Sequence, residues 1–275
     1  MGADISVRFW GVRGSIACPG MQTARYGGNT ACVEVRCGGH LLIFDAGTGL
    51  RALGNALLET SSTVDADIFF SHYHMDHICG LPFFAPCHVA SSRLRLWGGL
   101  LPTRRIKEVT QSIMTEPFFP AGPNSFSARI DFRDFHAGDS LQPHAGVTLR
   151  TGPLVHPGGS IGYRLEHGDR SIVYITDTEH RPGKVDPNVL RLAAGADVMI
   201  YDAQYTDEEF ATHIGWGHST WQEGVRLADA AAAKLLVIFH HDPKHDDNFL
   251  DGVIREASAL RPQTLVATEG QTLRI

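Results

Sequence analysis

Hydrophobic and polar positions alternate along the first part of the chain in a way that predicts strands and one helix. Period-2 patterns predict strands at 5–10, 31–36 and 40–45, because alternate side chains of a strand face opposite sides. Gly38-Gly39 predicts a hairpin turn between the last two, and a helix is expected near 49–59. The short apolar run 67–70 predicts a buried strand that leads directly into His72.

The second part of the chain alternates strands with helices, and three strands end at a polar residue. The predicted strands lie at 147–155, 160–166, 171–176, 197–201 and 235–239, with helices at 186–194 and 220–233, and then a last helix and a short strand. One reversal separates the strand ending at His156 from the strand ending at Asp177, and two crossover helices make the strand ending at His240 parallel to both. All three side chains are therefore expected at one sheet edge, where open α/β sheets commonly bind ligands.

The stretch 90–140 has the least regular pattern. It contains a predicted helix near 103–114 and a Pro/Gly-rich loop at 117–123. We interpret the stretch as an insertion that shapes the mouth of a pocket. Because strands and helices continue to alternate after it, without repeats or low-complexity segments, residues 1–275 are expected to form a single domain.

Composition narrows the class of protein. Hydrophobic residues make up 43% of the 275 residues, which is ordinary for a soluble globular protein. No apolar run approaches the ~20 residues that span a bilayer, and the first ten residues read as a strand rather than a signal peptide. A cytoplasmic protein without a membrane partner is expected. Five cysteines without a CxxC pair indicate neither a disulfide framework nor a zinc knuckle.

The segment His72-Tyr73-His74-Met75-Asp76-His77 carries the most specific chemistry in the chain. In an extended segment His72 and His74 point the same way and can hold one metal ion together. Asp76 and His77 follow where the chain is expected to turn into a helix, so they point elsewhere and can hold a second ion. Imidazole and carboxylate ligands suit zinc, and also manganese or iron. Two divalent transition-metal ions are therefore predicted, zinc first among them.

The HxHxDH pattern resembles the signature of the metallo-β-lactamase superfamily, and the resemblance covers nearly the whole chain. It implies an α/β fold, an αββα sandwich of two mixed sheets flanked by helices, with the metal site at one edge. It also implies that Asp45 supports the ligands from behind. The ligands that it implies are His72, His74 and His156 for one ion, Asp76, His77 and His240 for the other, and Asp177 as the bridge, with a water or hydroxide between the ions.

The last ligand has a neighbour of the same type, His241. The first residue after an apolar strand is the one aimed at the edge where the other ligands lie. This favours His240 over His241, and the alternative stays open.

Two further segments resemble the branch that contains ribonuclease Z and small phosphodiesterases. They are 197–203, with sequence DVMIYDA, and 217–220, with sequence GHST. In that branch the matching Glu and His help catalysis beside the metals, which makes Asp202 and His218 candidate catalytic residues together with Asp76. Asp202 stands where Glu is usual and is one methylene shorter, and Tyr201 replaces a His. Ser219 is expected to cap the helix at 220–233, with Gln222 as its capping-box partner.

Two departures from ribonuclease Z bear on the substrate. No flexible basic Gly/Pro-rich arm, which grips transfer RNA in that enzyme, is visible, and His240 is followed by His-Asp-Pro instead of Ser and Arg. The formal net charge of −6 also disfavours a nucleic-acid partner. A structured RNA substrate is therefore not expected. A group of basic residues is read as a solvated helix face: Arg93, Arg95, Arg104, Arg105 and Lys107.

Three functions are compatible with these patterns. Hydrolysis of a small phosphodiester is favoured by the resemblance of the His218 segment, and two metals can clamp both oxygens of its in-line displacement. Hydrolysis of a lactone, thioester or β-lactam uses the same nucleophile on a carbonyl. The third is a non-hydrolytic role in redox chemistry, binding or cofactor biosynthesis. The oligomeric state is open, and a homodimer is compatible with the sequence.

Overall fold

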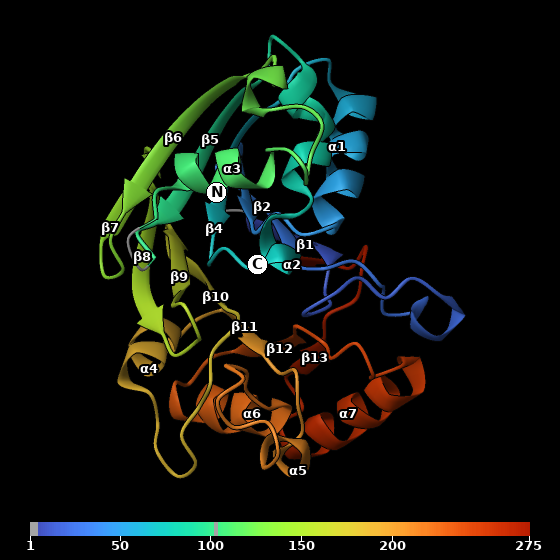
Figure 1. Ribbon diagram of the computed structural model, residues 1–275. Helices are drawn as coiled ribbons and strands as arrows, with labels where there is room; N and C mark the ends of the chain where they lie inside the picture. The colour runs from blue at the N-terminus through green and yellow to red at the C-terminus, as the bar shows by residue number, and fades with distance from the viewer. Residues whose placement is uncertain (1–4, 102–103) are drawn as a thin grey trace.

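The computed structural model describes residues 5–101 and 104–275. Two seven-stranded sheets pack face to face, and helices cover their outer faces (Figure 1). This is the αββα sandwich that the sequence predicted. The metal-ligand candidates lie where the two sheets meet, so the arrangement of each sheet decides the position of the site.

The first sheet contains strands from the first half of the chain and one from its C-terminal part. In sheet order they are β14 (Thr272–Arg274), β1 (Ile5–Gly11), β2 (Cys32–Cys37), β3 (His40–Phe44), β4 (Asp65–Phe70), β5 (Arg93–Gly99) and β6 (Arg129–Phe135). From β3 to β6 the strands run parallel, while the others are antiparallel to their neighbours. Helix α1 (Gly49–Thr60) buries Leu50, Leu53 and Leu57, which recur on one helical face, against this sheet.

The second sheet contains the three strands whose ends the sequence predicted to meet. In sheet order it holds β13 (Thr264–Val266), β12 (Leu235–Phe239), β11 (Val198–Asp202), β10 (Arg170–Ile175), β9 (Ser160–His167), β8 (Val147–Leu154) and β7 (Ser140–His144). β9 is antiparallel to both β8 and β10, and β10, β11 and β12 are parallel. The strands that precede His156, Asp177 and His240 therefore run in the same direction, as predicted.

Crossover helices cover the outer face of the second sheet (Figure 1). The remaining α-helices are α2 (Met75–Ile78), α3 (Ile106–Ile113), α4 (Pro187–Ala193), α5 (Asp207–Phe210), α6 (Trp221–Ala230) and α7 (Asp247–Leu260).

The predicted cap of α6 was wrong by one residue. Thr220 is extended and its hydroxyl accepts a hydrogen bond from Glu223 N at 3.0 Å, so the helix begins one residue later than expected. The Ser219 hydroxyl instead contacts Tyr201 and His180.

Aromatic rings from both sheets fill the centre of the sandwich. Phe44 of the first sheet lies 5.4 Å from Tyr163 and 5.5 Å from Tyr174 of the second, measured between ring centroids. Phe69 lies 6.0 Å from Tyr163. All four side chains are buried, and each stabilises the fold by about 1.5–3 kcal/mol on burial. This packing fixes one sheet against the other and so fixes the strand ends that carry the site.

The expectation of an insertion at 90–140 was wrong, although residues of this stretch do line a pocket beside the ligands, as expected. β5 and β6 lie within this stretch and extend the first sheet as parallel strands. The Arg-Leu-Arg-Leu pattern of β5 has period 2, with Leu94 and Leu96 buried in the core. The expected helix at 103–114 is α3, which starts at Ile106, and residue 103 lies outside the described residues.

The basic residues of this stretch do not form one helix face. Arg93 and Arg95 lie on β5. The Arg95 guanidinium donates hydrogen bonds to Asp67 at 2.7 Å and to Asp65 at 2.5 Å. The interpretation was therefore wrong for these two residues, because the segment forms a strand. Lys107 lies on α3 and is exposed, as expected.

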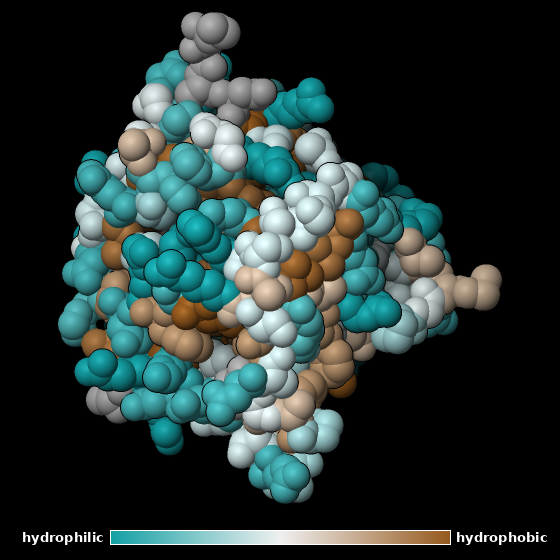
Figure 2. All heavy atoms as spheres, turned by 90° about the horizontal axis from the view of Figure 1, so that it is seen from above, coloured by the Kyte–Doolittle hydropathy of each residue, from teal (hydrophilic) through white to brown (hydrophobic). Residues whose placement is uncertain are grey.

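The surface carries mostly polar side chains. Figure 2 shows hydrophilic residues over much of one face, with patches of hydrophobic residues between them. Among residues 5–101 and 104–275, none of the helices is long and apolar enough to cross a membrane. All five cysteines are free thiols.

Candidate metal centre

The structure brings all seven predicted ligand residues together at one edge of the sandwich. Four follow β4 of the first sheet, and three follow strands of the second. Their ligand atoms form two groups, and within each group these atoms lie within 4.8 Å of one another. The outer group is His72, His74, His156 and Asp177, and the inner group is Asp76, His77, Asp177 and His240.

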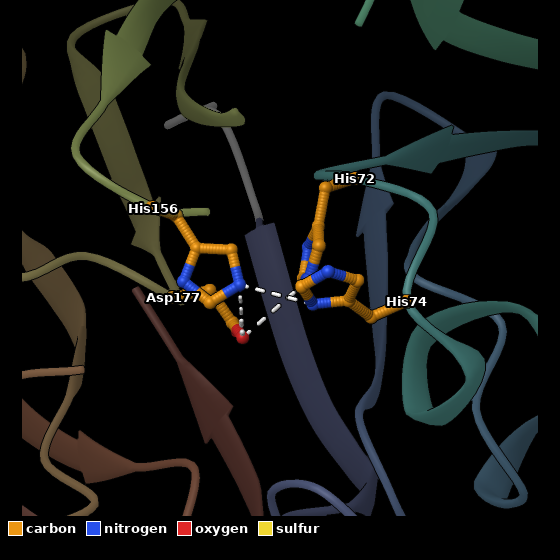
Figure 3. A group of neighbouring side chains, drawn as sticks. All are labelled: His72, His74, His156 and Asp177. Atoms are coloured by element: carbon orange, nitrogen blue, oxygen red, sulfur yellow. Dashed lines mark hydrogen bonds and ion pairs between the residues drawn. The ribbon is translucent and has the colours of Figure 1, made fainter. Parts of the chain in front are cut away.

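The side chains of the outer group point toward one another (Figure 3). His156 Nε2 lies 3.0 Å from His74 Nδ1. Asp177 Oδ2 lies 3.5 Å from His72 Nε2 and 3.6 Å from His156 Nε2. His74 is exposed, so this group opens toward solvent on the side of His74, whereas the His156 side chain is buried.

The inner group is buried throughout. Asp177 Oδ1 lies 3.1 Å from His77 Nε2 and 3.2 Å from His240 Nε2. Asp76 Oδ2 lies 3.2 Å and 3.4 Å from the same two nitrogens. Asp177 thus turns one carboxylate oxygen toward each group, which is the arrangement that a bridging carboxylate requires.

Hydrogen bonds behind the ligands fix which ring nitrogen faces the centre. His77 Nδ1 contacts Asp45 Oδ2 at 2.8 Å, and His156 Nδ1 contacts the Gly217 carbonyl at 2.7 Å. Both partners are acceptors, so each Nδ1 carries a proton and each Nε2 is the ring nitrogen left to bind a metal ion. Imidazole nitrogens and carboxylate oxygens therefore converge on the centre.

His72 supplies the most direct test of whether metal ions fit. Its Nδ1 contacts the Ser71 hydroxyl at 3.0 Å, while its Nε2 is buried without a hydrogen-bond partner. Burial lowers the pKa of His72 well below its ordinary value, which keeps the ring neutral. Burial alone would lower the pKa of His77, but the carboxylates of Asp177, Asp76 and Asp45 raise it well above its ordinary value, so a bound metal ion would take the place of the Nε2 proton. Neutral imidazoles and ionised carboxylates fit divalent transition-metal ions.

Asp45 lies behind the ligands, in the supporting position that the sequence indicated. It accepts hydrogen bonds from Ser71 N at 2.7 Å, from the Ser71 hydroxyl at 2.8 Å and from the Tyr174 hydroxyl at 2.8 Å. Through Ser71 it also orients His72, in addition to its direct contact with His77. Tyr174 belongs to the second sheet, so this one carboxylate ties both sheets to the ligand segment.

Three residues at strand ends adopt a left-handed backbone that non-glycine residues rarely take. The φ angles are 61° at Asp45, 48° at Asp177 and 64° at His240. Such conformations cost on the order of 1–3 kcal/mol each and gather at functional sites. Asp177 and His240 turn their side chains toward the centre just after apolar strands, and Asp45 turns its side chain toward the back of the ligand segment. Packing of the strands holds the backbone in this conformation.

Gln204 is a residue of the site that the sequence reasoning missed. It lies two residues beyond the end of β11 and is buried. His240 Nδ1 donates to Gln204 Oε1 at 3.1 Å, and Gln204 Nε2 donates to Asp242 Oδ2 at 3.2 Å. The signal available in the sequence was its position at the same sheet edge as Asp202.

His241 lies away from the ligand groups. It is fully buried, and its Nε2 donates to the Ala267 carbonyl at 2.8 Å. Burial lowers the pKa of His241 to about 3. The structure therefore places His240, and not His241, in the inner group.

His218 and Asp202 form a buried pair beside the carboxylate of Asp177. His218 Nδ1 lies 3.2 Å from Asp202 Oδ2 and 3.8 Å from Asp177 Oδ2. Thr178 N donates to the same Asp202 oxygen at 2.9 Å and holds it in place. The aspartate therefore reaches the histidine although it is one methylene shorter than the glutamate usual there.

The environment of His218 favours its charged form. Burial alone would lower the pKa of His218, but the Asp202 carboxylate outweighs burial and raises it to about 9. The ring stacks on the His240 ring, with centroids 5.0 Å apart. The carboxylates around it thus favour a protonated His218 at neutral pH, next to both ligand groups.

One loop positions both His156 and His218. Gly217 has a φ of 87°, and a Cβ there would lie 2.3 Å from His156 Nδ1, so only glycine fits. The Glu179 carboxylate accepts hydrogen bonds from Gly215 N at 2.7 Å and from Gly217 N at 2.8 Å. These two hydrogen bonds fix the Gly217 carbonyl, which orients His156. They also fix the start of the segment that carries His218, the candidate acid.

Known proteins resemble this chain in both sequence and structure. Residues 40–241 match the family described as "Beta-lactamase superfamily domain". Ribonuclease Z of Mycobacterium sp. (strain KMS) is 27% identical over 241 residues, which covers 76% of each chain. The metallo-beta-lactamase fold protein YhfI from Bacillus subtilis superposes with a TM-score of 0.73 at 18% identity over 100% of both chains. A diphosphatase from the PhnP family gives 0.72 at 19% identity, over 99% of this chain and 97% of the other.

Proposed function

The chain belongs to the beta-lactamase superfamily, as its HxHxDH segment indicated, and from that premise we propose that it is a dinuclear metal-dependent hydrolase of small phosphodiesters. One observation carries the choice of a phosphodiester. The protonated His218, which is held by Asp202, lies 3.8 Å from the carboxylate of Asp177, and both ligand groups share that carboxylate. A cation at this position suits a substrate that is itself an anion.

The donor atoms determine which metal ions fit the two ligand groups. Six histidine or aspartate side chains divide between the groups, and Asp177 serves both. Zinc is proposed first, and manganese or iron would accept the same nitrogen and oxygen ligands. When bound, two such ions supply Lewis acidity and lower the pKa of a bound water.

The protein's own residues supply the proton chemistry. Asp202 holds His218 Nδ1 at 3.2 Å and leaves the other ring nitrogen for the substrate. From the charged ring, that nitrogen can donate a proton to the leaving oxygen or a hydrogen bond to a phosphate oxygen. General acid catalysis of this kind contributes about 10²–10⁴-fold in rate. Asp76 would act as a metal ligand. Its carboxylate also accepts a hydrogen bond from Ser15 N at 2.7 Å, which fixes the orientation of the side chain.

Structured RNA was not expected as a substrate, and the similarity to relatives named ribonuclease Z conflicts in part with that expectation. Features of this chain support a smaller substrate. The Pro/Gly-rich loop 117–123 contains no Lys or Arg, and the formal net charge is −6. Phosphate-dominated binding of RNA depends on clustered cations. A small phosphodiester is therefore the proposed substrate, and RNA is the first competitor to be tested.

A parallel rate assay tests the proposal. Protein loaded separately with zinc and with manganese would be given a bis-aryl phosphate, a cyclic nucleotide, a lactone, a thioester and a cephalosporin. A phosphodiester should show the highest kcat/KM. A lactone or cephalosporin turned over faster than every phosphodiester would replace the proposal with the carboxylic-ester alternative. The single-domain organisation over 1–275, the cytoplasmic location and a homodimer remain predictions.

A further inference from the structure

A pocket of about 400 Å³ opens beside the outer ligand group. His72 and His74 form one part of its wall, α3 forms another, and the turn that starts at Pro157 forms a third. The volume is within the usual range for small-molecule sites. If the phosphate of a substrate is held at the outer group, the ester group on that side would therefore enter this pocket.

The wall that α3 contributes is mostly apolar, with Ser112 as the polar residue among its described lining. Ile106 and Thr110 of this helix are buried, whereas Val109 and Ile113 are half-buried and line the pocket. Val109 and Ile113 are four residues apart, so their side chains lie on the same helical face. The helix thus presents a second apolar strip beside the one that it packs into the core.

The side of the pocket opposite to solvent carries little charge. The Tyr73 hydroxyl donates to the Gly99 carbonyl at 2.6 Å, and burial raises the pKa of Tyr73, so the ring is neutral and its hydroxyl is engaged. Ile78, Leu101 and Pro157 add apolar surface. Apart from the histidine ligands, Arg104 is the one side chain of the described lining that is charged at neutral pH, and it is exposed.

We propose that this pocket binds an uncharged, apolar ester group of the size of an aromatic ring, so that the preferred substrates are phosphodiesters with such a group next to a more polar one. The inference rests on the proposed phosphodiesterase activity and specifies its substrate class. Binding an apolar group there removes it from water together with Val109 and Ile113, which is favourable in proportion to the area buried. A second sugar or a bare methyl group would leave the apolar walls in contact with water.

Two substrates with the same leaving group isolate the contribution of the pocket. Benzyl 4-nitrophenyl phosphate and methyl 4-nitrophenyl phosphate release the same phenol and retain alcohols of nearly equal acidity, so the two diesters differ mainly in the apolar size of the ester group that stays on phosphorus. The wild-type protein should prefer the benzyl substrate by about 10-fold or more in kcat/KM, the scale of small apolar differences in a pocket. Ile113→Asp should remove most of this preference, because the apolar ring would then lie against a carboxylate.

A matched control stands on the same helix. Gln111 is exposed and lies outside the pocket lining, so Gln111→Asp adds the same charge to α3 without touching the pocket. This variant should keep the wild-type preference. If Ile113→Asp fails to fold, Ile113→Ala should lower the preference by a smaller factor. Metal content, measured for each variant, should equal that of the wild type.

Binding of non-hydrolysable probes separates the pocket from the reaction. Phenylphosphonate should bind more tightly than methylphosphonate in calorimetry, with a more negative heat-capacity change. Equal kcat/KM for the two diesters, or equal effects of the Asp substitutions at 111 and 113, would overturn the pocket inference and leave the phosphodiesterase proposal standing. Tighter phenylphosphonate binding without turnover of either diester would support the pocket and overturn the proposed activity.

Discussion

Asp202 Oδ2 lies 3.2 Å from His218 Nδ1, in a pair that is buried next to the bridging candidate Asp177. The pair forms although the sequence places an aspartate where the related branch has a glutamate. Thr178 N holds the same oxygen from the other side at 2.9 Å. The dyad is therefore preorganised, and its chemistry can be tested apart from the metals.

Replacement of His218 tests its role as a general acid. His218→Ala should lower kcat by at least about 10²-fold on a phosphodiester with a poor leaving group. The loss should shrink on an aryl phosphate whose leaving group needs no proton. Metal content should stay at the wild-type value. Unchanged turnover would make His218 a packing residue, and loss of metal would make it a ligand.

The pH profile tests the raised pKa of His218. Its pKa is about 9, so the charged acid is present below that pH and is lost as pH rises through it. The rate with a poor leaving group should therefore fall near pH 9. Because Asp202 raises this pKa, Asp202→Asn should move the alkaline limb to lower pH. An alkaline limb that stays in place in this variant would assign the limb to another group.

Replacing Asp177 should change the metal content in a different way from replacing any other proposed ligand. Elemental analysis of the wild type should find close to two transition-metal ions per chain. Asp177→Ala should lower occupancy at both sites, because one carboxylate oxygen faces each group. His240→Ala should lower only that of the inner site. One ion or none at saturating metal in the wild type would contradict the dinuclear proposal.

Gln204 should control the affinity of the inner site without being a ligand. Gln204→Leu removes the acceptor of His240 Nδ1 and should weaken binding of one ion by about 10–100-fold, the usual effect of losing such support. Gln204→Glu keeps an acceptor and should retain most of the affinity. Competition with a chelating dye measures both. Equal affinities in the two variants would show that the contact has no effect on the metal.

Transfer RNA binding tests the proposed small substrate. Electrophoretic or fluorescence titration at several salt concentrations should find no tight complex. A complex held by phosphates would weaken steeply as salt rises. Tight, salt-sensitive binding would restore a ribonuclease Z role and withdraw the small-substrate proposal.

The parts of the site that the sequence predicted depend on local pattern and strand direction. HxHxDH lies within six residues, and each of His156, Asp177 and His240 follows an apolar run. The rule that crossover connections make strands parallel then places their ends at one edge. The structure has this arrangement because its strands pair as that rule requires.

The parts that were missed depend on contacts between distant residues. β5 pairs with β4 and with β6, for example Arg93 with Asp65 and with Arg129, and the sequence alone does not show pairing between residues this far apart. Gln204 acquires its role only from the approach of His240, 36 residues along the chain. The cap of α6 was missed by one residue because Ser219 and Thr220 are both good caps, and the fold uses the Ser219 hydroxyl elsewhere.

The division of the ligands between the two sheets sets the order in which the protein can mature. His77 and His240 are 163 positions apart, so a ribosome that adds about 5–20 residues per second exposes the second roughly 8–33 s after the first. During that interval the emerging chain offers the HxHxDH segment without the bridging carboxylate or the last imidazole. With the proposed ligand set, stable metal capture is expected to be a late step in biogenesis that follows the docking of the second sheet.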